Sequence, residues 1–169
     1  MKYACRSDAG QRPRNEDHYY APPPHEAALV IVADGMGGHN AGMVASRLAV
    51  ETVTACLNGG ENLGDDRIRE AIARANEIIY WGAQREDACR GMGTTITLAV
   101  LDPHRYIAAN IGDSRVYHYV AAQNSLRQIT QDHSYVAALV ASGEITWREA
   151  ARHPQRNIIT RALGTREKE

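Results

Sequence analysis

The chain has 169 residues, of which 19 are basic and 20 acidic, and its formal net charge at pH 7 is -1. This length fits one domain with a substantial core, and the balanced charge gives no reason to expect nucleic acid or an anionic membrane surface as a partner. Three widely spaced cysteines, and the lack of an apolar run of the roughly 18 residues that a membrane span needs, favour a cytoplasmic protein.

The N-terminal half predicts two strands followed by two helices. Short apolar runs over 3–7 and 27–33 are typical of strands, and the second is expected to be fully buried and to end on Asp34. Apolar residues at helical spacing then predict one helix around 44–56 and another around 68–79. For the second helix we expect an N-terminal cap from Asp65 or Asp66 and a Glu70 to Arg74 pair.

The C-terminal half predicts a run of strands and then a broken helix. The expected strands are 94–101, 106–111, 115–120 and 126–130. Their connectors are too short for parallel crossovers, so we expect an antiparallel meander. A helical region over 135–152 is split by Ser142 and Gly143. The whole pattern indicates the α+β class, with antiparallel sheets covered by helices on their outer faces.

Candidate cation ligands lie at two places before the first predicted helix, at Asp34 and at the adjacent Glu16 and Asp17. Asp34 is followed by Gly35, whose carbonyl can approach a ligand closely, and this combination suits a hard cation that prefers oxygen ligands. It also fits a turn aspartate that caps the following helix. Glu16 and Asp17 are adjacent, so on an extended segment one can contact a metal directly and the other only through water. Arg12 just upstream could hold an anion, although a solvated charged loop explains this stretch as well.

Two further clusters lie in the C-terminal half. Asp113 occupies a tight turn after an apolar strand, where a hairpin aspartate is the usual interpretation. Asp132 and His133 are neighbours, which fits either a base with its orienting carboxylate or a capping aspartate beside a packed histidine.

Taken together and in this order, the motifs resemble one family, the bacterial PPM-type metal-dependent protein phosphatases (protein phosphatase 2C type). The matching blocks, spread over nearly the whole chain, are "SDAGQRPRNED", "VADGMGGHNAG", "GMGTTITLAVL", "ANIGDSRVYHY", "ITQDHS" and "RNIITRALG".

The resemblance implies an antiparallel β-sandwich flanked by helices on both outer faces, in α-β-β-α layers. It also implies hydrolysis of phosphoserine and phosphothreonine in proteins by a metal-activated water, with two or three Mn²⁺ or Mg²⁺ ions as cofactors. The expected partners are phosphorylated proteins, namely a serine/threonine kinase that the enzyme opposes or the substrates of that kinase.

By motif position, the resemblance assigns a role to each acidic residue of the first two clusters. Asp17 would bind one metal, Asp34 would bridge two, and the Gly35 carbonyl would bind the second. Glu16 would act through a water molecule, and Arg12 would hold the substrate phosphate.

The remaining implied features lie further along the chain. Asp113 would bind the third metal that bacterial members often carry, and residues 134–157 would form the flap that influences substrate choice. Met36 stands where some relatives have a histidine proposed to protonate the leaving group, and nearby His39 is not assigned that role.

The sequence departs from the family pattern at its C-terminal end. Relatives continue past "RALG" with more strands and with further aspartates that complete the metal site, whereas Asp34-Gly35 is the only Asp-Gly pair here and no Asp-Asn occurs. We therefore expect residues 1–169 to form a single phosphatase domain that is incomplete at its C-terminus. Three alternatives remain: a non-catalytic phosphatase-like binding module, an inactive fragment that needs its C-terminal segment, and a second chain that supplies the missing strands.

Overall fold

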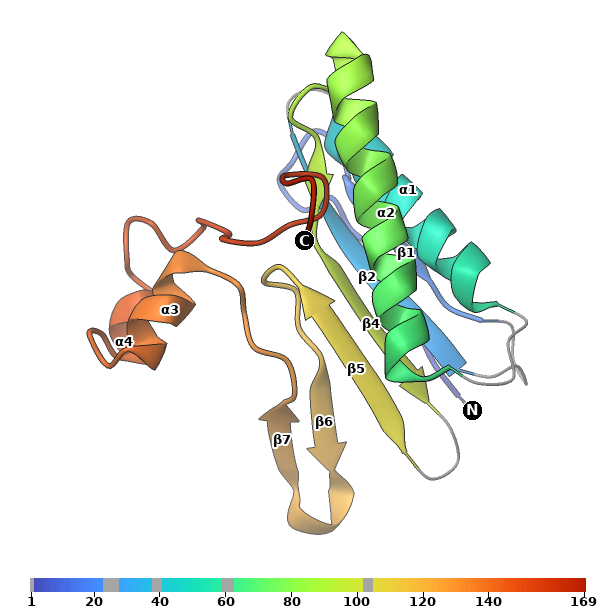
Figure 1. Cartoon of the computed structure of the whole chain (residues 1–169). Helices are drawn as coiled ribbons and strands as arrows, with labels where there is room; N and C mark the ends of the chain where they lie inside the picture. The colour runs from blue at the N-terminus through green and yellow to red at the C-terminus, as the bar shows by residue number, and fades with distance from the viewer. Residues whose placement is uncertain (1, 23–27, 38–40, 59–62, 102–104) are drawn as a thin grey trace.

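A computed structural model of the chain describes residues 2–22, 28–37, 41–58, 63–101 and 105–169. Its main sheet is antiparallel, with strand order β1-β2-β4-β5 and a short β3 that pairs with β2. The strands are β1 (Asp17–Tyr20), β2 (Ala28–Met36), β3 (Gly93–Thr94), β4 (Ile96–Leu101) and β5 (Tyr106–Ile111). The helices α1 (Ala41–Leu57) and α2 (Asp65–Arg85) lie side by side over one face of this sheet, and a short turn η1 (Asp87–Cys89) follows α2 (Figure 1). The predicted α+β class with antiparallel sheets is confirmed.

The core lies between these two helices and the sheet. The helices contribute small and branched residues at helical spacing, which are Ala45, Ala49, Val53, Leu57, Ile68, Ile72, Ala75 and Ile79. The small side chains of α1 allow its backbone to approach the sheet closely, while the isoleucines of α2 fill the remaining space. Both helices therefore bury the apolar face that their periodicity predicts. Among the described residues, no helix is both long and apolar enough to cross a membrane.

The details predicted for the surface of α2 are wrong. The helix begins after Gly64, which provides no side-chain cap, so neither Asp65 nor Asp66 is the cap. Both aspartates lie in the first turn instead, where the positive end of the helix dipole stabilises them. Arg74 pairs with Glu77 at 2.7 Å, because residues three apart also share a helix face.

Strand β2 is buried on one face only and is longer than predicted. Its residues that pack against the helices are Leu29, Ile31 and Ala33. On the opposite face Val32 is exposed and Asp34 is half-buried. The strand does not end at Asp34, because Gly35 pairs with Thr94 and Met36 continues the ladder. Asp34 therefore lies within the strand, on the face of the sheet away from the helices. Residue 27 of the predicted strand, like His39, lies outside the described residues.

No strand forms over residues 3–7, where the sequence predicts one. All five residues are exposed, so an extended conformation there would gain no burial against the core. The first strand is β1, which begins at Asp17 and pairs antiparallel with β2.

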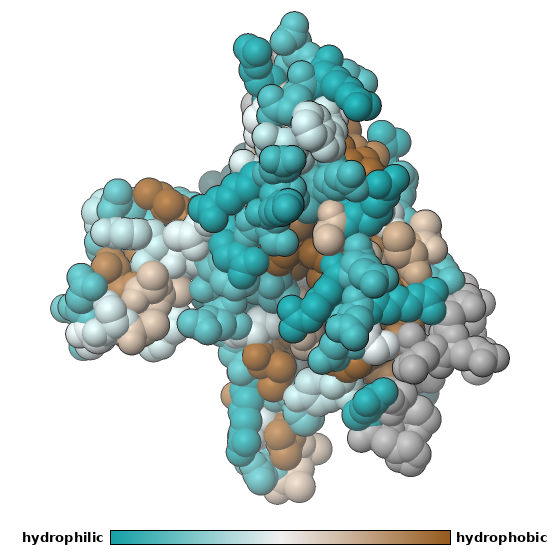
Figure 2. Space-filling view, viewed as in Figure 1, coloured by the Kyte–Doolittle hydropathy of each residue, from teal (hydrophilic) through white to brown (hydrophobic). Residues whose placement is uncertain are grey.

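The predicted meander is interrupted after β5. Strands β4 and β5 pair antiparallel, and a separate antiparallel pair is formed by β6 (Tyr117–Val120) and β7 (Ser125–Gln128), joined by the turn η2 (Ala121–Gln123). Within the described ranges β5 and β6 do not pair, because residues 112–115 turn toward Asp132 and His133. Hydrophobic side chains reach the surface of the β6-β7 hairpin (Figure 2), where Leu126 is 65% exposed.

The predicted broken helix over 135–152 is confirmed as two short helices, α3 (Tyr135–Ala141) and α4 (Trp147–Ala150). Ser134 caps α3 by accepting a hydrogen bond from the Ala137 amide. We call residues 134–157 the lobe, because in Figure 1 this segment stands away from the main sheet. An isolated bridge between Ser134 and Ile159 joins its two ends.

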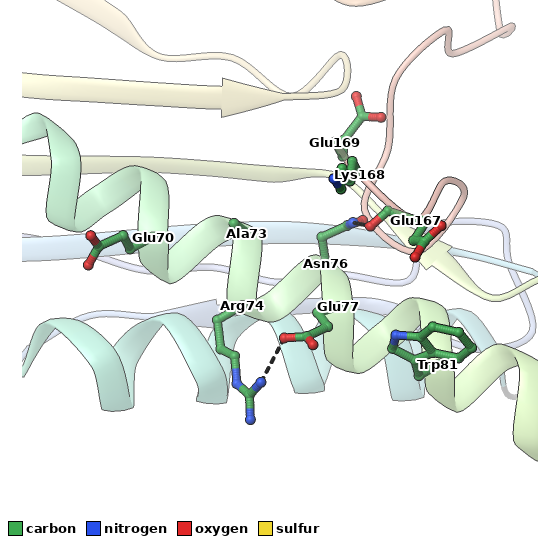
Figure 3. A pocket seen from close by; sticks show the side chains of 9 residues that line it. All are labelled: Glu70, Ala73, Arg74, Asn76, Glu77, Trp81, Glu167, Lys168 and Glu169. Carbon is green, nitrogen blue, oxygen red and sulfur yellow. Dashed lines mark hydrogen bonds and ion pairs between the residues drawn. The ribbon is translucent and has the colours of Figure 1, made fainter.

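One buried amide ties the last residues of the chain to α2. The Asn76 side chain donates to the carbonyls of Arg166 and Glu167, each at 3.1 Å, and accepts from the Gly164 amide at 2.8 Å. Figure 3 shows Asn76 among the side chains that line a pocket between α2 and residues 167–169. The volume of this pocket is about 630 Å³. None of its lining residues belongs to the acidic clusters predicted as a site.

Asn76→Ala should lower the free energy of unfolding by about 2 kcal/mol, because the buried Gly164 amide loses its acceptor and a small cavity opens. Urea denaturation measures this change. Asn58→Ala, at the exposed end of α1, is the control and should shift stability by no more than about 0.5 kcal/mol. Equal losses in both variants would contradict the anchoring role of Asn76.

Candidate active site

Two predicted site residues face each other across strands β1 and β2. The register pairs Asp17 with Asp34, and directly opposed residues of an antiparallel pair project to the same face with Cβ atoms about 5 Å apart. Both side chains are half-buried. The structure thus brings together two carboxylates that are 17 positions apart in the chain, on the face of the sheet away from the helices.

The backbone of Asp34 is held by two threonines at the break between β3 and β4. Its amide donates to Thr95 Oγ1 at 2.9 Å, and its carbonyl accepts from the Thr95 amide at 2.9 Å and from Thr94 Oγ1 at 3.0 Å. The strand pattern over 94–101 does not distinguish these threonines from their neighbours. The signal in the sequence is two adjacent hydroxyl residues at the start of an apolar strand, because a hydroxyl that becomes buried needs a partner.

Glu16 and Gly35 meet where α1 crosses the end of β2. The Gly35 amide donates to the Glu16 carbonyl at 3.1 Å, and Ser46 of α1 donates its hydroxyl to the same carbonyl at 2.6 Å. A Cβ atom on Gly35 would lie 2.0 Å from the Gly42 carbonyl oxygen, so only glycine allows this approach. One Glu16 carboxylate oxygen lies 2.9 Å from the position of a Cβ on Gly42, which places that carboxylate beside the start of α1.

Arg12 is the cation next to this pair of carboxylates. Its Nη1 lies 3.8 Å from Asp34 Oδ1, and most of its side chain is exposed. A turn closed by the Arg12 amide on the Ala9 carbonyl at 3.0 Å brings it there. Further along the same segment, the Asn15 side chain accepts from the Asp17 amide at 3.0 Å and leads the chain into β1.

The site raises the pKa of Asp34 above its ordinary value of 3.8. Burial is the largest cause, and the nearby Asp17 carboxylate adds to it. Arg12 opposes the shift, whereas Asp113 raises the pKa further. Asp113 therefore belongs electrostatically to the same site, although it comes from the turn after β5.

Asp132 and His133 do not form the base and orienter that their adjacency allows, and Asp132 is not a cap either, since Ser134 caps α3. Asp132 is buried and pairs with Arg115. His133 accepts a hydrogen bond at Nδ1 from the Gly112 amide at 3.2 Å. Burial, followed by the charge of Arg161, lowers the pKa of His133, so its ring is neutral at pH 7.

The donor atoms gathered here are carboxylate and carbonyl oxygens, which are the ligands that Mn²⁺ and Mg²⁺ prefer. In the described part of the chain, no three His, Cys, Asp or Glu side chains converge closely enough to enclose a metal ion. Of the predicted ligands, Asp17 and Asp34 face each other across the two strands, Glu16 is next to Asp17 in the chain, and Asp113 lies close enough to affect the pKa of Asp34.

A known protein family matches nearly the whole chain. The family model for protein phosphatase 2C matches residues 6–163. The chain is 43% identical over 142 residues to serine/threonine phosphatase stp of Listeria welshimeri, covering 80% of this chain and 55% of that protein. It therefore spans little more than half the length of that relative.

Solved structures agree with this result. The serine/threonine phosphatase PstP/Ppp of Mycobacterium tuberculosis superposes with a TM-score of 0.87 at 42% identity, over 99% of this chain and 70% of that one. The catalytic domain of the serine/threonine protein phosphatase PstP in complex with two manganese ions gives a TM-score of 0.85 at 37% identity, over 99% of this chain and 69% of that one.

Proposed function

The chain belongs to the protein phosphatase 2C family, and we propose on this basis that the protein hydrolyses phosphoserine and phosphothreonine in other proteins. The observation that carries the proposal is the facing pair of Asp17 and Asp34, with Arg12 3.8 Å from Asp34. Two carboxylates suit divalent cations, and a guanidinium suits the phosphate that these cations would help to bind. The same site therefore offers carboxylates to the metal ions and a guanidinium to the substrate phosphate.

Asp17, Asp34 and the Gly35 carbonyl would hold two Mn²⁺ or Mg²⁺ ions, with Glu16 acting through a water molecule. A PstP relative solved with two manganese ions supports this assignment. When bound, such ions lower the pKa of water toward neutrality and stabilise negative charge on phosphoryl oxygens. Asp113, which raises the pKa of Asp34 from the neighbouring turn, would bind a third ion.

The chain's own residues contribute position and charge. Thr94 and Thr95 hold the backbone of Asp34, so the point from which its carboxylate projects is set before any ligand binds. Arg12 is exposed and can turn from Asp34 toward a phosphate oxygen. No side chain in this arrangement needs to act as a covalent nucleophile.

The lobe, residues 134–157, would act as the flap that influences which phosphoproteins are accepted. It stands apart from the main sheet (Figure 1) and begins directly after Asp132 and His133, which contact the Asp113 turn. The substrates would be phosphoproteins of a bacterial cytoplasm, and the reaction would oppose a serine/threonine kinase. Residues 1–169 would form one domain together with any segment that completes it.

Mn²⁺-dependent release of phosphate from a phosphothreonine peptide tests the function, using the protein expressed from its natural reading frame. We expect turnover that EDTA abolishes and that added Mn²⁺ restores. Turnover that is indifferent to EDTA would contradict the proposal. Tight binding of the peptide without phosphate release would instead support the alternative, a non-catalytic phosphatase-like module.

Arg12→Ala should lower kcat/KM for p-nitrophenyl phosphate about 100-fold, because one charge-assisted contact to the transferred phosphoryl group is lost. Steady-state kinetics in saturating Mn²⁺ measures this effect. The control is Arg6→Ala, which removes another exposed arginine that pairs with Asp8 at 2.9 Å in the same segment. A similar loss in both variants would mean that general positive charge, rather than Arg12 itself, assists the reaction.

A further inference from the structure

Within the described part of the chain, Asp113 is held in place by the contacts of the residues next to it in the sequence. Among the described residues, its carboxylate accepts no hydrogen bond, and the turn that carries it is joined to the Asp34 amide through Ser114 and Thr95. The residues on either side make the contacts: Gly112 with His133, Ser114 with Thr95, and Arg115 with Asp132. The position of this carboxylate therefore depends on the hydrogen bonds and the ion pair that hold residues 112–115.

Among the contacts of this turn, the ion pair is the one between Arg115 and Asp132. The guanidinium places Nε 2.9 Å from both carboxylate oxygens and Nη2 2.5 Å from Oδ2. The Asp132 side chain is 4% exposed and also accepts from Gln128 Nε2 at 2.9 Å, so its charge is buried and fully engaged. A planar fork of this kind fixes orientation as well as distance, which a lysine cannot do.

Contacts between the turn 112–115 and His133 also hold the residues at which the lobe begins. The His133 amide donates to the Gly112 carbonyl at 2.9 Å, and the Gly112 amide donates to His133 Nδ1 at 3.2 Å. The next residue, Ser134, caps α3, and the Thr160 amide returns to the His133 carbonyl at 2.8 Å. Asp132 and His133 thus connect the turn that carries Asp113 to both ends of the lobe.

On its other side, the turn is connected to Asp34. Ser114 Oγ lies 2.9 Å from Thr95 Oγ1, and Thr95 Oγ1 accepts from the Asp34 amide at 2.9 Å. The ion pair also lines a cavity of about 330 Å³ that extends from Asp113 to Trp147 of the lobe. One set of direct contacts therefore runs from Asp34 through the turn to the lobe.

We propose that Arg115 is a positioning residue that, through its fork on Asp132, sets the place of Asp113 relative to Asp34 and to the lobe. This inference rests on the proposed function, since it concerns how the phosphatase site is assembled. Arg115 itself would touch neither substrate nor metal. Its loss would release the turn and the base of the lobe together while leaving the helical core intact.

Amide hydrogen exchange tests this without any metal. Arg115→Lys keeps a positive charge opposite the buried Asp132 but removes the fork, and Arg115→Gln removes the charge as well. In both variants we expect the Gly112 and His133 amides to exchange at least about tenfold faster, with the Ala75 amide in α2 unchanged. The matched control is Arg74→Gln, which breaks the exposed 2.7 Å pair with Glu77 and should change none of these amides.

The second readout is a double-mutant cycle in which calorimetry measures the Mn²⁺ affinity of each variant. Asp113→Asn and Arg115→Lys should each weaken Mn²⁺ binding, and the double variant should bind no more weakly than Asp113→Asn alone, because both changes act through one carboxylate. Exchange that stays unchanged at Gly112 and His133, or rises equally at Ala75, would overturn the inference. So would losses of Mn²⁺ affinity that add in the double variant.

The cycle also separates the two proposals. If Asp113→Asn leaves Mn²⁺ binding unaltered, the proposed metal role of Asp113 fails. The exchange rates at Gly112 and His133 still decide whether Arg115 holds the turn, because they are measured without metal.

Discussion

Asp34→Asn should lower kcat/KM for p-nitrophenyl phosphate by about 1000-fold or more and, in the metal-free protein, raise the midpoint of thermal unfolding at pH 7. The first effect follows because asparagine lacks the negative charge that a bridging metal ligand needs. The second follows because burial and the carboxylates of Asp17 and Asp113 disfavour an ionised Asp34 in the folded state. Kinetics in Mn²⁺ and calorimetric scans in EDTA measure the two effects.

The direction of the pH dependence can be worked out from the raised pKa of Asp34. The folded protein binds this proton more tightly than the unfolded chain, so the associated stability is present below pH 3.8 and is lost as pH rises through the folded-state pKa. In EDTA, wild type and Asp34→Asn should therefore converge in stability at low pH and diverge toward neutrality. Added Mn²⁺ at 100 times its Kd should stabilise the wild type by about 2.7 kcal/mol, and we expect this gain to reverse the order of the two proteins.

Asp66→Asn is the matched control for Asp34→Asn, since it makes the same chemical change at an exposed position in the first turn of α2. It should retain wild-type kcat/KM and show no gain in stability. If Asp34→Asn kept Mn²⁺-dependent turnover, or lost stability in EDTA, the assignment of Asp34 to a metal-binding pair of mutually repelling carboxylates would be wrong.

The elements that the sequence predicts correctly are those whose apolar residues follow a helix or strand pattern within one continuous segment. The 3.6-residue spacing of Ile68, Ile72 and Ile79 identified α2, and the β5 strand at 106–111 was predicted with its observed bounds. The run over 3–7 failed, because apolar composition alone does not show whether a partner strand exists. Strand β1 was not predicted as a strand, since its first residues are polar and its place depends on pairing with β2.

The candidate site divides in the same way. Ordered motif blocks predict Asp17 and Asp34 as site residues, and the structure places them opposite each other by a strand register that no local pattern contains. The contacts that hold the site join residues far apart in sequence, such as Thr95 with Asp34 and Arg115 with Asp132. Asp132 was interpreted beside its neighbour His133, because its actual partner lies 17 residues away in the chain.

Gly35→Ala should be severely destabilising, by about 3 kcal/mol or more, and should abolish Mn²⁺ binding with it. The new Cβ would lie 2.0 Å from the Gly42 carbonyl oxygen and 2.4 Å from its carbon, and 2.7 Å from the Glu16 carbonyl oxygen. All three are backbone atoms, so no side chain can rotate away to relieve the overlap. The start of α1 would have to move from β2, and this movement would break the hydrogen bond from Ser46 of α1 to the Glu16 carbonyl.

Gly82→Ala is the control that separates this clash from the general effect of adding a methyl group. Its Cβ would meet only the Met92 Cε atom, at 2.8 Å, which is the end of a flexible side chain. Because Gly82 lies inside α2, alanine should also favour the helix there, by up to about 1 kcal/mol. Urea denaturation should thus show a large loss for Gly35→Ala and a change near zero for Gly82→Ala. Comparable stabilities would mean that α1 is not seated against Gly35, and that the crossing does not hold Glu16 at the site.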